Sequence, residues 1–582
     1  MRTDHPGEPH PQRASRRPAD RDAASAQQAR RSLEDIARED YGLDRLRPGQ
    51  VEAMRALSTG RDVLAVMPTG YGKSAIYQVV GSQLPGPTVV VSPLIALQSD
   101  QVAGIEEAPD APEAVAVNSA QSAAENDDAW RAITGEDAEF LFLLPEQHAS
   151  ERVLQRVADL RPSLFVVDEA HCVSSWGHDF RPAYLTLADA VERLGHPRVV
   201  ALTATAAPPI RAEILERLGM RDPVLVAGGF DRPNLFLDVR RETSAEALRR
   251  AVLEDVAELA GGSGTGLVYV ARRRDAETYA AALTQRDIRA VAYHAGLTGD
   301  QRESAQHAFD TGSAEVVVAT SAFGMGIDKP DVRFVVHAAP PGSLDSYYQE
   351  IGRAGRDGDP ATVVLHFRPE DLALRRFFSS MTAPAEDLVA ALDAMGDGSA
   401  SMSALRAAAG LSPRRATAVV NLLVEVGAAE RRGRRLVRLR GVSAAEAAER
   451  ATAHVEARER VERSRVEMMR GYAETTGCRR EFLLGYFGEA YDPPCGTCDN
   501  CLTGQVSEPA SATGPGDFRP QESVVHDTFG TGTVMSVEDD RVTVFFPDHG
   551  YRTLAREHVV RQGLLERARA DDGGSLGPPS GC

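Results

Sequence analysis

The chain has 582 residues, of which 43% are hydrophobic and 26% are charged, and its formal net charge is −19. This length predicts about three to five domains of ordinary globular protein. No run of about 18 apolar residues occurs, so we expect no membrane span, and the first thirty residues lack the apolar stretch of a signal peptide. The negative net charge does not favour a nucleic-acid partner. Binding to nucleic acid depends, however, on the local electrostatic field of a basic surface patch and not on the net charge of the chain.

Residues 1–31 mix Arg with Asp and Glu, and we expect a disordered tail there. Short β-branched runs then alternate with helix-length segments over residues 32–208 and again over 209–370. This alternation predicts parallel sheets in two successive α/β domains, with a nucleotide in the crevice at the carboxyl ends of the strands. The expected strands are Val63–Met67, Thr88–Ser92, Phe140–Leu144, Leu164–Val167 and Val199–Thr203, followed by Gly266–Val270, Ala290–Tyr293, Val316–Thr320, Phe334–His337 and Thr362–His366.

Lysine is nearly absent from this chain, since only Lys73 and Lys329 occur among 65 basic residues. Lys73 lies in a glycine-containing segment directly after the first expected strand. Such a loop cradles phosphates, and a compact ammonium reaches the β- and γ-phosphates where a guanidinium fork has another shape. Met67 replaces the first glycine of the pattern, so a surface lysine beside a chance turn stays the alternative. The expected triphosphate loop comprises Met67, Pro68, Thr69, Gly70, Tyr71, Gly72, Lys73 and Ser74.

An acidic pair, Asp168 and Glu169, follows the buried run Leu164–Val167 and begins the segment Asp-Glu-Ala-His. Asp168 can hold Mg²⁺ through water, and Glu169 can polarise an attacking water. The Ser74 hydroxyl can supply a second contact to Mg²⁺. An acidic pair after a strand is often only a helix N-cap, but in combination with Lys73 and Ser74 it predicts hydrolysis of a nucleoside triphosphate.

Two arginines in the second expected α/β domain, Arg353 and Arg356, lie one helical turn apart in the segment Gln-Glu-Ile-Gly-Arg-Ala-Gly-Arg. From there they can reach across the crevice to a γ-phosphate and neutralise charge in the transition state. We expect both to be catalytic and hydrolysis to require closure of the two domains. The alternative is an exposed arginine pair on a helix.

Residues 384–440 are expected to form a winged-helix-like domain. Helical stretches precede Ser412, which opens a further helix, and an arginine-rich segment turns at Gly433 as a short hairpin. Basic residues on the helix and on the wing suit phosphate contacts and insertion into a groove. A helical packing domain with a charged edge is the alternative. The candidate nucleic-acid residues here are Arg414, Arg415, Arg434 and Arg435.

Four of the six cysteines cluster in residues 441–503, which we expect to be a helical module. Two consecutive C-x-x-C spacings and one distant cysteine supply four thiolates for tetrahedral Zn²⁺. This pattern favours a reducing compartment and a metal over disulfides. The candidate ligands are Cys478, Cys495, Cys498 and Cys501.

The remaining segments are expected to be a linker, a small domain and a tail. Gly, Pro, Ser and Ala dominate residues 504–519, as in flexible linkers. Residues 520–566 carry two glycines and a β-prone run, which predict a small β-barrel. Residues 567–582 are expected to be disordered.

Taken together, these motifs resemble those of superfamily-two helicases, and specifically of RecQ-type DNA helicases. The resemblance covers residues 35–368 and 470–503. It implies two tandem RecA-like domains, with a leading motif that contains Arg47 and Gln50, whose glutamine reads adenine. It also implies a DNA-contact motif over 92–97, a coupling motif over 203–205 and a fifth motif over 319–330 that contains Thr320.

The most specific part of the resemblance is an aromatic-rich loop just after Asp-Glu-Ala-His. In the family this loop senses single-stranded DNA and couples it to hydrolysis. Trp and Phe side chains can stack on unpaired bases while an arginine engages phosphate, although packing in a core is the usual fate of such aromatics. The residues carried over are Trp176, His178, Phe180 and Arg181.

The chain departs from the family in two places. About a hundred residues, with the winged-helix-like segment, separate the second α/β domain from the zinc module. The end of the chain, 520–566, resembles the Tudor-like barrel of UvrD-type helicases, which implies a protein partner such as RNA polymerase or a repair factor. A barrel that only stabilises the body is the alternative.

The resemblance implies an ATP-dependent 3′→5′ DNA helicase that acts in repair or recombination on single-stranded, tailed or forked DNA. Its expected cofactors are ATP, Mg²⁺ and Zn²⁺, and its expected location is the cytoplasm, in association with the nucleoid. The alternative from another class is a DNA-binding ATPase switch that recruits transcription or repair partners with little unwinding. An RNA helicase is a weaker alternative.

Overall fold

The computed structural model describes residues 31–174, 181–262, 264–324, 329–371, 384–396, 398–432, 435–439, 441–504, 506, 518–519, 522–537, 541–547 and 549–568. Nearly all of the two expected tails and most of the expected linker lie outside these residues. Within the described part, no helix is both long enough and apolar enough to cross a membrane.

The first α/β domain is a seven-stranded parallel sheet of order β3-β4-β2-β5-β6-β1-β7. Its central strands are continuous β-branched or apolar runs that are buried on both faces, as helices on both sides of a parallel sheet require. The strands are β1 Val63–Val66, β2 Thr88–Val91, β3 Ala114–Val117, β4 Phe140–Leu143, β5 Leu164–Val167, β6 Arg198–Thr203 and β7 Val224–Ala227. The α-helices are α2 Leu33–Glu39, α3 Pro48–Ser58, α4 Ser74–Gly81, α5 Ile95–Glu106, α6 Ala123–Thr134, α7 Glu151–Asp159, α8 Leu187–Arg193 and α9 Pro208–Arg217.

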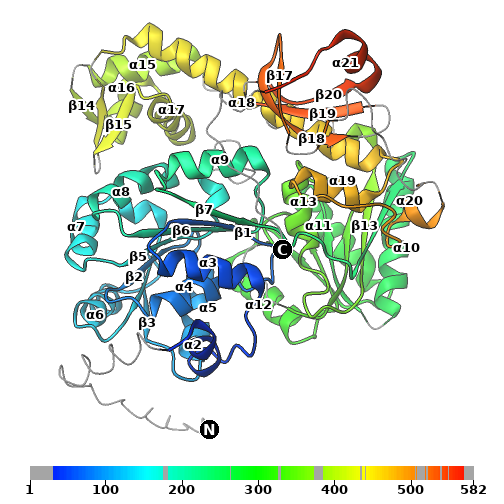
Figure 1. Ribbon diagram of the computed structural model, residues 1–582, viewed down its shortest axis with the longest axis horizontal. Coiled ribbons are helices and arrows are strands. Elements are labelled where there is room, and N and C mark those ends of the chain that lie inside the picture. The colour runs from blue at the N-terminus through cyan, green and yellow to red at the C-terminus, as the bar shows by residue number, and fades with distance from the viewer. Residues whose placement is uncertain are drawn as a thin grey trace.

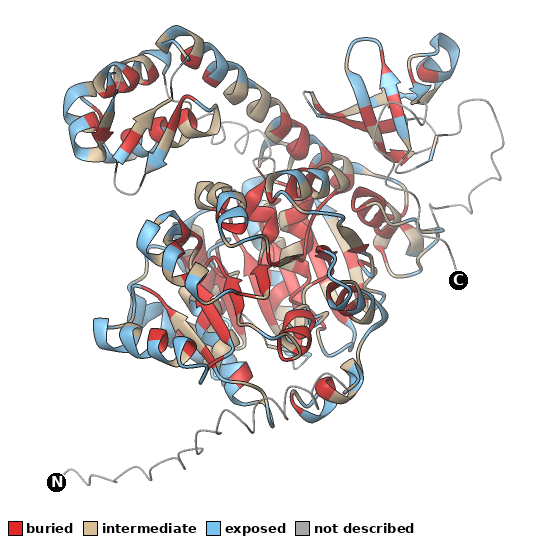
Figure 2. Cartoon of the chain, turned by 60° about the vertical axis from the view of Figure 1, so that its left-hand side comes forward, coloured by how far each residue is buried: buried red, intermediate tan, exposed pale blue. Residues whose placement is uncertain are grey.

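The second α/β domain is a six-stranded parallel sheet of order β10-β11-β9-β12-β13-β8. Figure 2 shows the strands of the body as its most buried part. The strands are β8 Leu235–Arg241, β9 Thr265–Tyr269, β10 Ala290–Tyr293, β11 Val316–Ala319, β12 Val332–His337 and β13 Ala361–Phe367. The helices are α10 Ala245–Gly261, α11 Arg273–Thr284, α12 Gly299–Asp310 and α13 Leu344–Ile351.

Every strand expected in the two α/β domains is present, but three others in the described part of these domains were missed. Strand β3 is an edge strand whose middle residues are half-buried, and β7 and β8 flank the junction between the domains. Strand β7 pairs in parallel with β1. The first sheet therefore extends to Ala227, and the boundary expected at residue 208 is too early, because sheet pairing rather than local composition decides where a domain ends.

The next segment has the element order of a winged helix, with α15 Ala385–Met395 and β14 Ser399–Ser401 followed by α16 Met402–Ala409 and α17 Pro413–Glu425. Strands β15 Ala429–Arg432 and β16 Arg435–Arg438 then form an antiparallel hairpin, with β16 between β14 and β15. This domain has a core of its own. Figure 1 shows it above α8 and α9, at one end of the long helix α18, Ala444–Glu474.

Helix α18 leads from the winged helix to the zinc module, α19 Arg479–Tyr486 and α20 Asp499–Leu502, and to the C-terminal sheet. That sheet is antiparallel, of order β20-β19-β18-β17-β21. Its elements are β17 Ser523–His526, β18 Gly530–Val537, β19 Arg541–Phe546, β20 Gly550–Ala555, α21 Arg556–Gln562 and β21 Glu566–Arg567. The expected fold class, two parallel-sheet domains followed by helical, zinc-binding and small β elements, is confirmed.

The C-terminal sheet packs on α18 and α19 through an apolar face that joins the main core, with Met535, Phe545 and Tyr551. A buried ion pair lies beside this contact. Arg465 of α18 donates to Asp345 of α13 at 2.8 Å, and the two side chains are 2% and 0% exposed. The Tyr486 hydroxyl donates to the same carboxylate at 2.5 Å. One carboxylate therefore joins α13, the long helix and the zinc module.

Replacing Arg465 by alanine leaves the Asp345 carboxylate buried without its cation. We expect this change to destabilise the packing of the accessory modules by about 3–5 kcal/mol. The matched control is Arg463→Ala on the same helix, because Arg463 is 60% exposed and pairs with Glu459 at 2.8 Å, and such pairs contribute about 1 kcal/mol or less. Urea unfolding followed by circular dichroism measures both variants, and equal stabilities would contradict the assignment.

Candidate nucleotide and metal sites

The expected triphosphate loop, 67–74, connects β1 to the first turn of α4. Gly70 and Gly72 have φ angles of 77° and 80°, a region that glycine adopts at little cost. The Lys73 ammonium donates to the carbonyl of Met67 at 3.1 Å and to that of Pro68 at 3.4 Å. Burial lowers the pKa of Lys73, and the nearby carboxylates of Glu169 and Asp168 oppose this shift. The loop therefore brings one half-buried cation next to the acidic pair.

Gln50, which the resemblance implies to be an adenine reader, lies on α3 against this loop. Its Oε1 accepts from the Arg47 backbone N–H at 2.7 Å. Its Nε2 donates to the carbonyls of Tyr71 and Gly72, at 3.1 and 2.7 Å. The Arg47 guanidinium lies 4.6 Å from the centroid of the Tyr71 ring. Gln50 thus holds the loop in place in this structure, and Arg47 and Tyr71 form a flat surface beside it.

The acidic pair follows β5. Burial, and then the adjacent Glu169 carboxylate, raise the pKa of Asp168 to about 6. Glu169 has a φ of 48°, a left-handed conformation that costs energy in a residue with a side chain and is common at functional sites. Its carboxylate lies 3.3 Å from Nδ1 of His171, and the same nitrogen lies 3.0 Å from the Thr203 hydroxyl. A hydrogen bond between His171 and Thr203 therefore joins the acidic segment to the coupling segment 203–205.

The two arginines of the second domain do not lie on a helical turn as expected. Helix α13 ends at Ile351, and Gly355 has a φ of 57°. A Cβ added at Gly355 would lie 2.4 Å from Nδ2 of Asn234. Arg353 and Arg356 therefore lie in the turns after α13, with Gly355 in a left-handed conformation between them.

Arg356 lies against the triphosphate loop. A Cβ added at Gly70 would lie 3.6 Å from Cγ of Arg356, and the charge of Arg356 contributes to lowering the pKa of Lys73. A Cβ added at Gly352 would likewise lie 3.7 Å from Cβ of Thr69. The two α/β domains thus meet at this loop, with one arginine of the pair at the meeting point.

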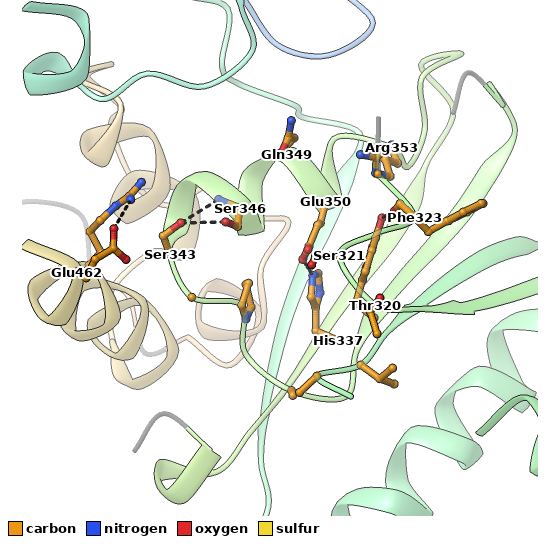
Figure 3. A pocket seen from close by; sticks show the side chains of 18 residues that line it. Thr320, Ser321, Phe323, His337, Ser343, Ser346, Gln349, Glu350, Arg353 and Glu462 are labelled. Atoms are coloured by element: carbon orange, nitrogen blue, oxygen red, sulfur yellow. Dashed lines mark hydrogen bonds and ion pairs between the residues drawn. The ribbon is translucent and has the colours of Figure 1, made fainter. Parts of the chain in front are cut away.

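Arg353 instead lines a pocket of about 330 Å³ in the second domain, between the carboxyl ends of β9, β11 and β12 and the helices α13 and α18. Arg353 is 5% exposed. Figure 3 shows it beside Phe323, with His337 facing Glu350 below; Nε2 of this histidine lies 2.8 Å from the Glu350 carboxylate. The expected DNA residue Thr320 lines the same pocket.

The candidate nucleic-acid residues are placed unequally. Trp176, His178, Phe180 and Arg434 lie outside the described residues, as does the side chain of Arg414. Arg181 donates to the Pro93 carbonyl at 2.7 Å and so connects the end of the aromatic-rich loop to segment 92–97. Exposed Arg415 forms a 2.6 Å ion pair with Asp387. Exposed Arg435 donates to the Ser399 hydroxyl at 2.8 Å.

The four candidate zinc ligands come together. The Sγ atoms of Cys478, Cys495, Cys498 and Cys501 all lie within 4.8 Å of one another, and those of Cys495 and Cys501 are 3.8 Å apart. A tetrahedral zinc site with bonds of about 2.3 Å has sulfur–sulfur edges of about 3.8 Å. The four thiolates therefore fit Zn²⁺, which would tie α19, α20 and the loop before α20 together.

The zinc module is anchored on the edge strand of the second domain. The Leu237 backbone N–H donates to the Thr497 carbonyl at 3.0 Å. Arg480 donates to the Leu235 carbonyl at 2.8 Å and forms an ion pair with Asp231. Arg479 donates to the Asp499 carboxylate at 2.8 Å. The metal-binding loop therefore also covers the exposed edge of β8.

Two site residues were missed from the sequence, Gln101 of α5 and Tyr77 of α4. Gln101 donates to the Asp168 carboxylate at 2.9 Å and accepts from the Tyr77 hydroxyl at 3.0 Å. Neither lies in a recognisable motif. Gln101 is identified only by its contact with Asp168, 67 positions away in the sequence, and Tyr77 only by its contact with Gln101.

The described geometry is that of a two-domain nucleoside triphosphatase with an accessory zinc module. Residues 47–212 match the DEAD/DEAH box helicase family, 247–358 the helicase conserved C-terminal domain and 437–502 the RecQ zinc-binding family. The fold is similar to that of the DUF1998 helicase MrfA bound to DNA and AMPPNP, with a TM-score of 0.52 at 19% identity over 72% of this chain and 63% of that chain.

Relatives of known class specify the family. The chain is 33% identical over 470 residues to the probable ATP-dependent DNA helicase RecS of Bacillus subtilis, which covers 79% of this chain and 90% of the relative. It is 34% identical over 470 residues to the ATP-dependent DNA helicase RecQ of Pasteurella multocida, over 80% of this chain and 62% of that longer relative. The chain belongs to the RecQ-type DNA helicases.

Proposed function

We propose that this chain is an ATP-dependent DNA helicase that unwinds DNA with 3′→5′ polarity, in repair or recombination. The observation that carries the proposal is the meeting of the two α/β domains at the triphosphate loop, where Arg356 of one faces Lys73 of the other. A triphosphate held there is contacted from both domains. Its hydrolysis then changes how the domains pack, and this is how ATP can drive movement along a strand.

In this scheme each residue of the site has one task. Lys73 and the backbone of the loop bind the phosphates, and Ser74 and Asp168 would hold Mg²⁺, which shields phosphate charge when bound. Glu169 orients the attacking water, and Arg356 neutralises charge on the transferred phosphoryl group. The link from His171 to Thr203 lies between these groups and the segments that contact DNA.

Strand displacement on a 3′-tailed duplex tests the proposal. We expect the wild-type chain to separate the strands with ATP and Mg²⁺, and Lys73→Ala to lose both unwinding and DNA-stimulated ATP hydrolysis, since the ammonium that binds the phosphates is gone. A 5′-tailed duplex serves as the substrate control. Hydrolysis without strand separation would favour the ATPase switch, and greater stimulation by RNA than by DNA would favour an RNA helicase.

A protein partner for the C-terminal barrel is a further part of the proposal. The C-terminal sheet packs on α18 and α19 through one face, while Val525 of the sheet and Val560 of α21 are 38% and 45% exposed. RNA polymerase and repair factors are the partners to which the resemblance points, in the cytoplasm with the nucleoid. Co-sedimentation of the purified chain with RNA polymerase measures this.

A further inference from the structure

Gln101 lies between Tyr77 of α4 and Asp168, one of the two residues expected to hold Mg²⁺. Its Nε2 donates to the Asp168 carboxylate at 2.9 Å, and its Oε1 accepts from the Tyr77 hydroxyl at 3.0 Å. A chain of hydrogen bonds, Tyr77–Gln101–Asp168, therefore ties one proposed magnesium ligand to α4, the helix that begins at Ser74.

This arrangement fixes the orientation of the amide. The Tyr77 side chain is fully buried and its hydroxyl needs an acceptor, which Oε1 of Gln101 provides. Nε2 is then directed at Asp168, where an amide N–H stabilises the ionised carboxylate. The other oxygen of Asp168 accepts from the Glu169 backbone N–H at 2.9 Å. With both oxygens engaged, the carboxylate has one orientation.

Gln101 is also attached to a DNA-contact segment. Its helix, α5, begins at Ile95, inside segment 92–97. The carbonyl of Pro93 in that segment accepts from Arg181, at the end of the aromatic-rich loop. A shift of this segment moves the start of α5, and Gln101 lies less than two turns further along the same helix.

We propose that Gln101 is a positioning residue that links the DNA-contact segment 92–97 to the magnesium carboxylate Asp168. The inference rests on the proposed function, because it assigns magnesium and DNA to the sites described above. Groups that hold a metal-binding carboxylate in place commonly contribute about 10- to 100-fold to metal affinity. Gln101 acts through Asp168 and does not itself reach the nucleotide.

The test is equilibrium binding of a fluorescent, non-hydrolysable ATP analogue to the full chain, with Mg²⁺ and with EDTA, in the presence and absence of an oligo-dT strand. In the wild-type chain we expect Mg²⁺ to increase affinity and the oligonucleotide to enlarge that increase. In Gln101→Leu the increase due to Mg²⁺ falls about tenfold and no longer responds to the oligonucleotide, while binding in EDTA is unchanged.

Two further variants make the result specific. Tyr77→Phe removes the hydroxyl that orients the amide, and we expect an intermediate loss. Ser99→Ala changes an exposed residue of the same helix whose hydroxyl donates to the Ile95 carbonyl, and we expect wild-type behaviour. Tyr77→Phe also keeps the test decisive if Gln101→Leu does not fold.

Three outcomes overturn the inference. The first is an unchanged effect of Mg²⁺ in Gln101→Leu, and the second is an equal loss of affinity in EDTA and in Mg²⁺. The third is a wild-type chain in which oligo-dT leaves the effect of Mg²⁺ unaltered. Failure of the proposed function is a separate result, because it shows as a wild-type chain that binds the analogue but separates no strands with ATP.

Discussion

Arg356→Ala is expected to lower the rate of ATP hydrolysis by about 10³-fold or more, with ATP affinity close to that of the wild-type chain. The aliphatic part of the Arg356 side chain lies against Gly70 of the triphosphate loop, and its charge is close enough to influence the Lys73 ammonium. A cation in that place interacts more strongly with the charge that develops on the transferred phosphoryl group than with bound ATP. Its removal therefore lowers the rate of turnover more than the affinity for ATP. Steady-state hydrolysis with saturating single-stranded DNA measures the first effect, and analogue binding measures the second.

Arg353→Ala is the matched comparison, since Arg353 is only three positions away but lines the pocket of the second domain. There burial raises the pKa of Tyr269, and the positive charge of Arg353 opposes this shift to a smaller extent. We expect a smaller loss of turnover than in Arg356→Ala, and a thermal melt of both variants separates this from loss of folding. A greater loss of turnover in a folded Arg353→Ala would reverse the roles of the two arginines.

The second large effect concerns zinc. Cys498→Ser removes one of four thiolates that lie within 4.8 Å of one another, and we expect the purified chain to lose its one equivalent of zinc. Zinc binding contributes about 10 kcal/mol or more to the folding of small zinc domains. The loss of zinc should therefore unfold the module and lower the thermal stability of the chain.

The contacts of Cys498 indicate how far unfolding of the zinc module would extend into the second α/β domain. It lies in a bridge with Leu237 of β8, so unfolding of the module uncovers the edge of the second sheet. Elemental analysis measures the zinc content, and proteolysis near residues 235–241 measures the uncovered edge. Cys582→Ser is the control, because Cys582 belongs to no metal-ligand spacing. A Cys498→Ser chain with full zinc content and wild-type stability would contradict the assignment.

Much of the fold was readable because its signals are local. Buried parallel strands are unbroken β-branched runs, so ten strands could be predicted from composition alone. The zinc ligands were predicted from spacing, because two consecutive C-x-x-C spacings in one short segment keep their thiols close together in space. Strands β3, β7 and β8 lacked a comparable signal, because one is a half-buried edge strand and two lie at a junction.

The amino-acid sequence by itself determined the chemistry available to this protein. It supplied the loop that carries Lys73, the acidic pair, the arginine pair and the four cysteines, because each depends on residue type at short spacing. Only the tertiary structure decided which of these groups meet. It placed Arg356 against Gly70 and Arg353 in the pocket of the second domain, because α13 ends before both and Gly355 between them has a left-handed conformation. It also brought Gln101 to Asp168 across 67 positions, since such contacts arise from the order of strands in a sheet and from no local pattern.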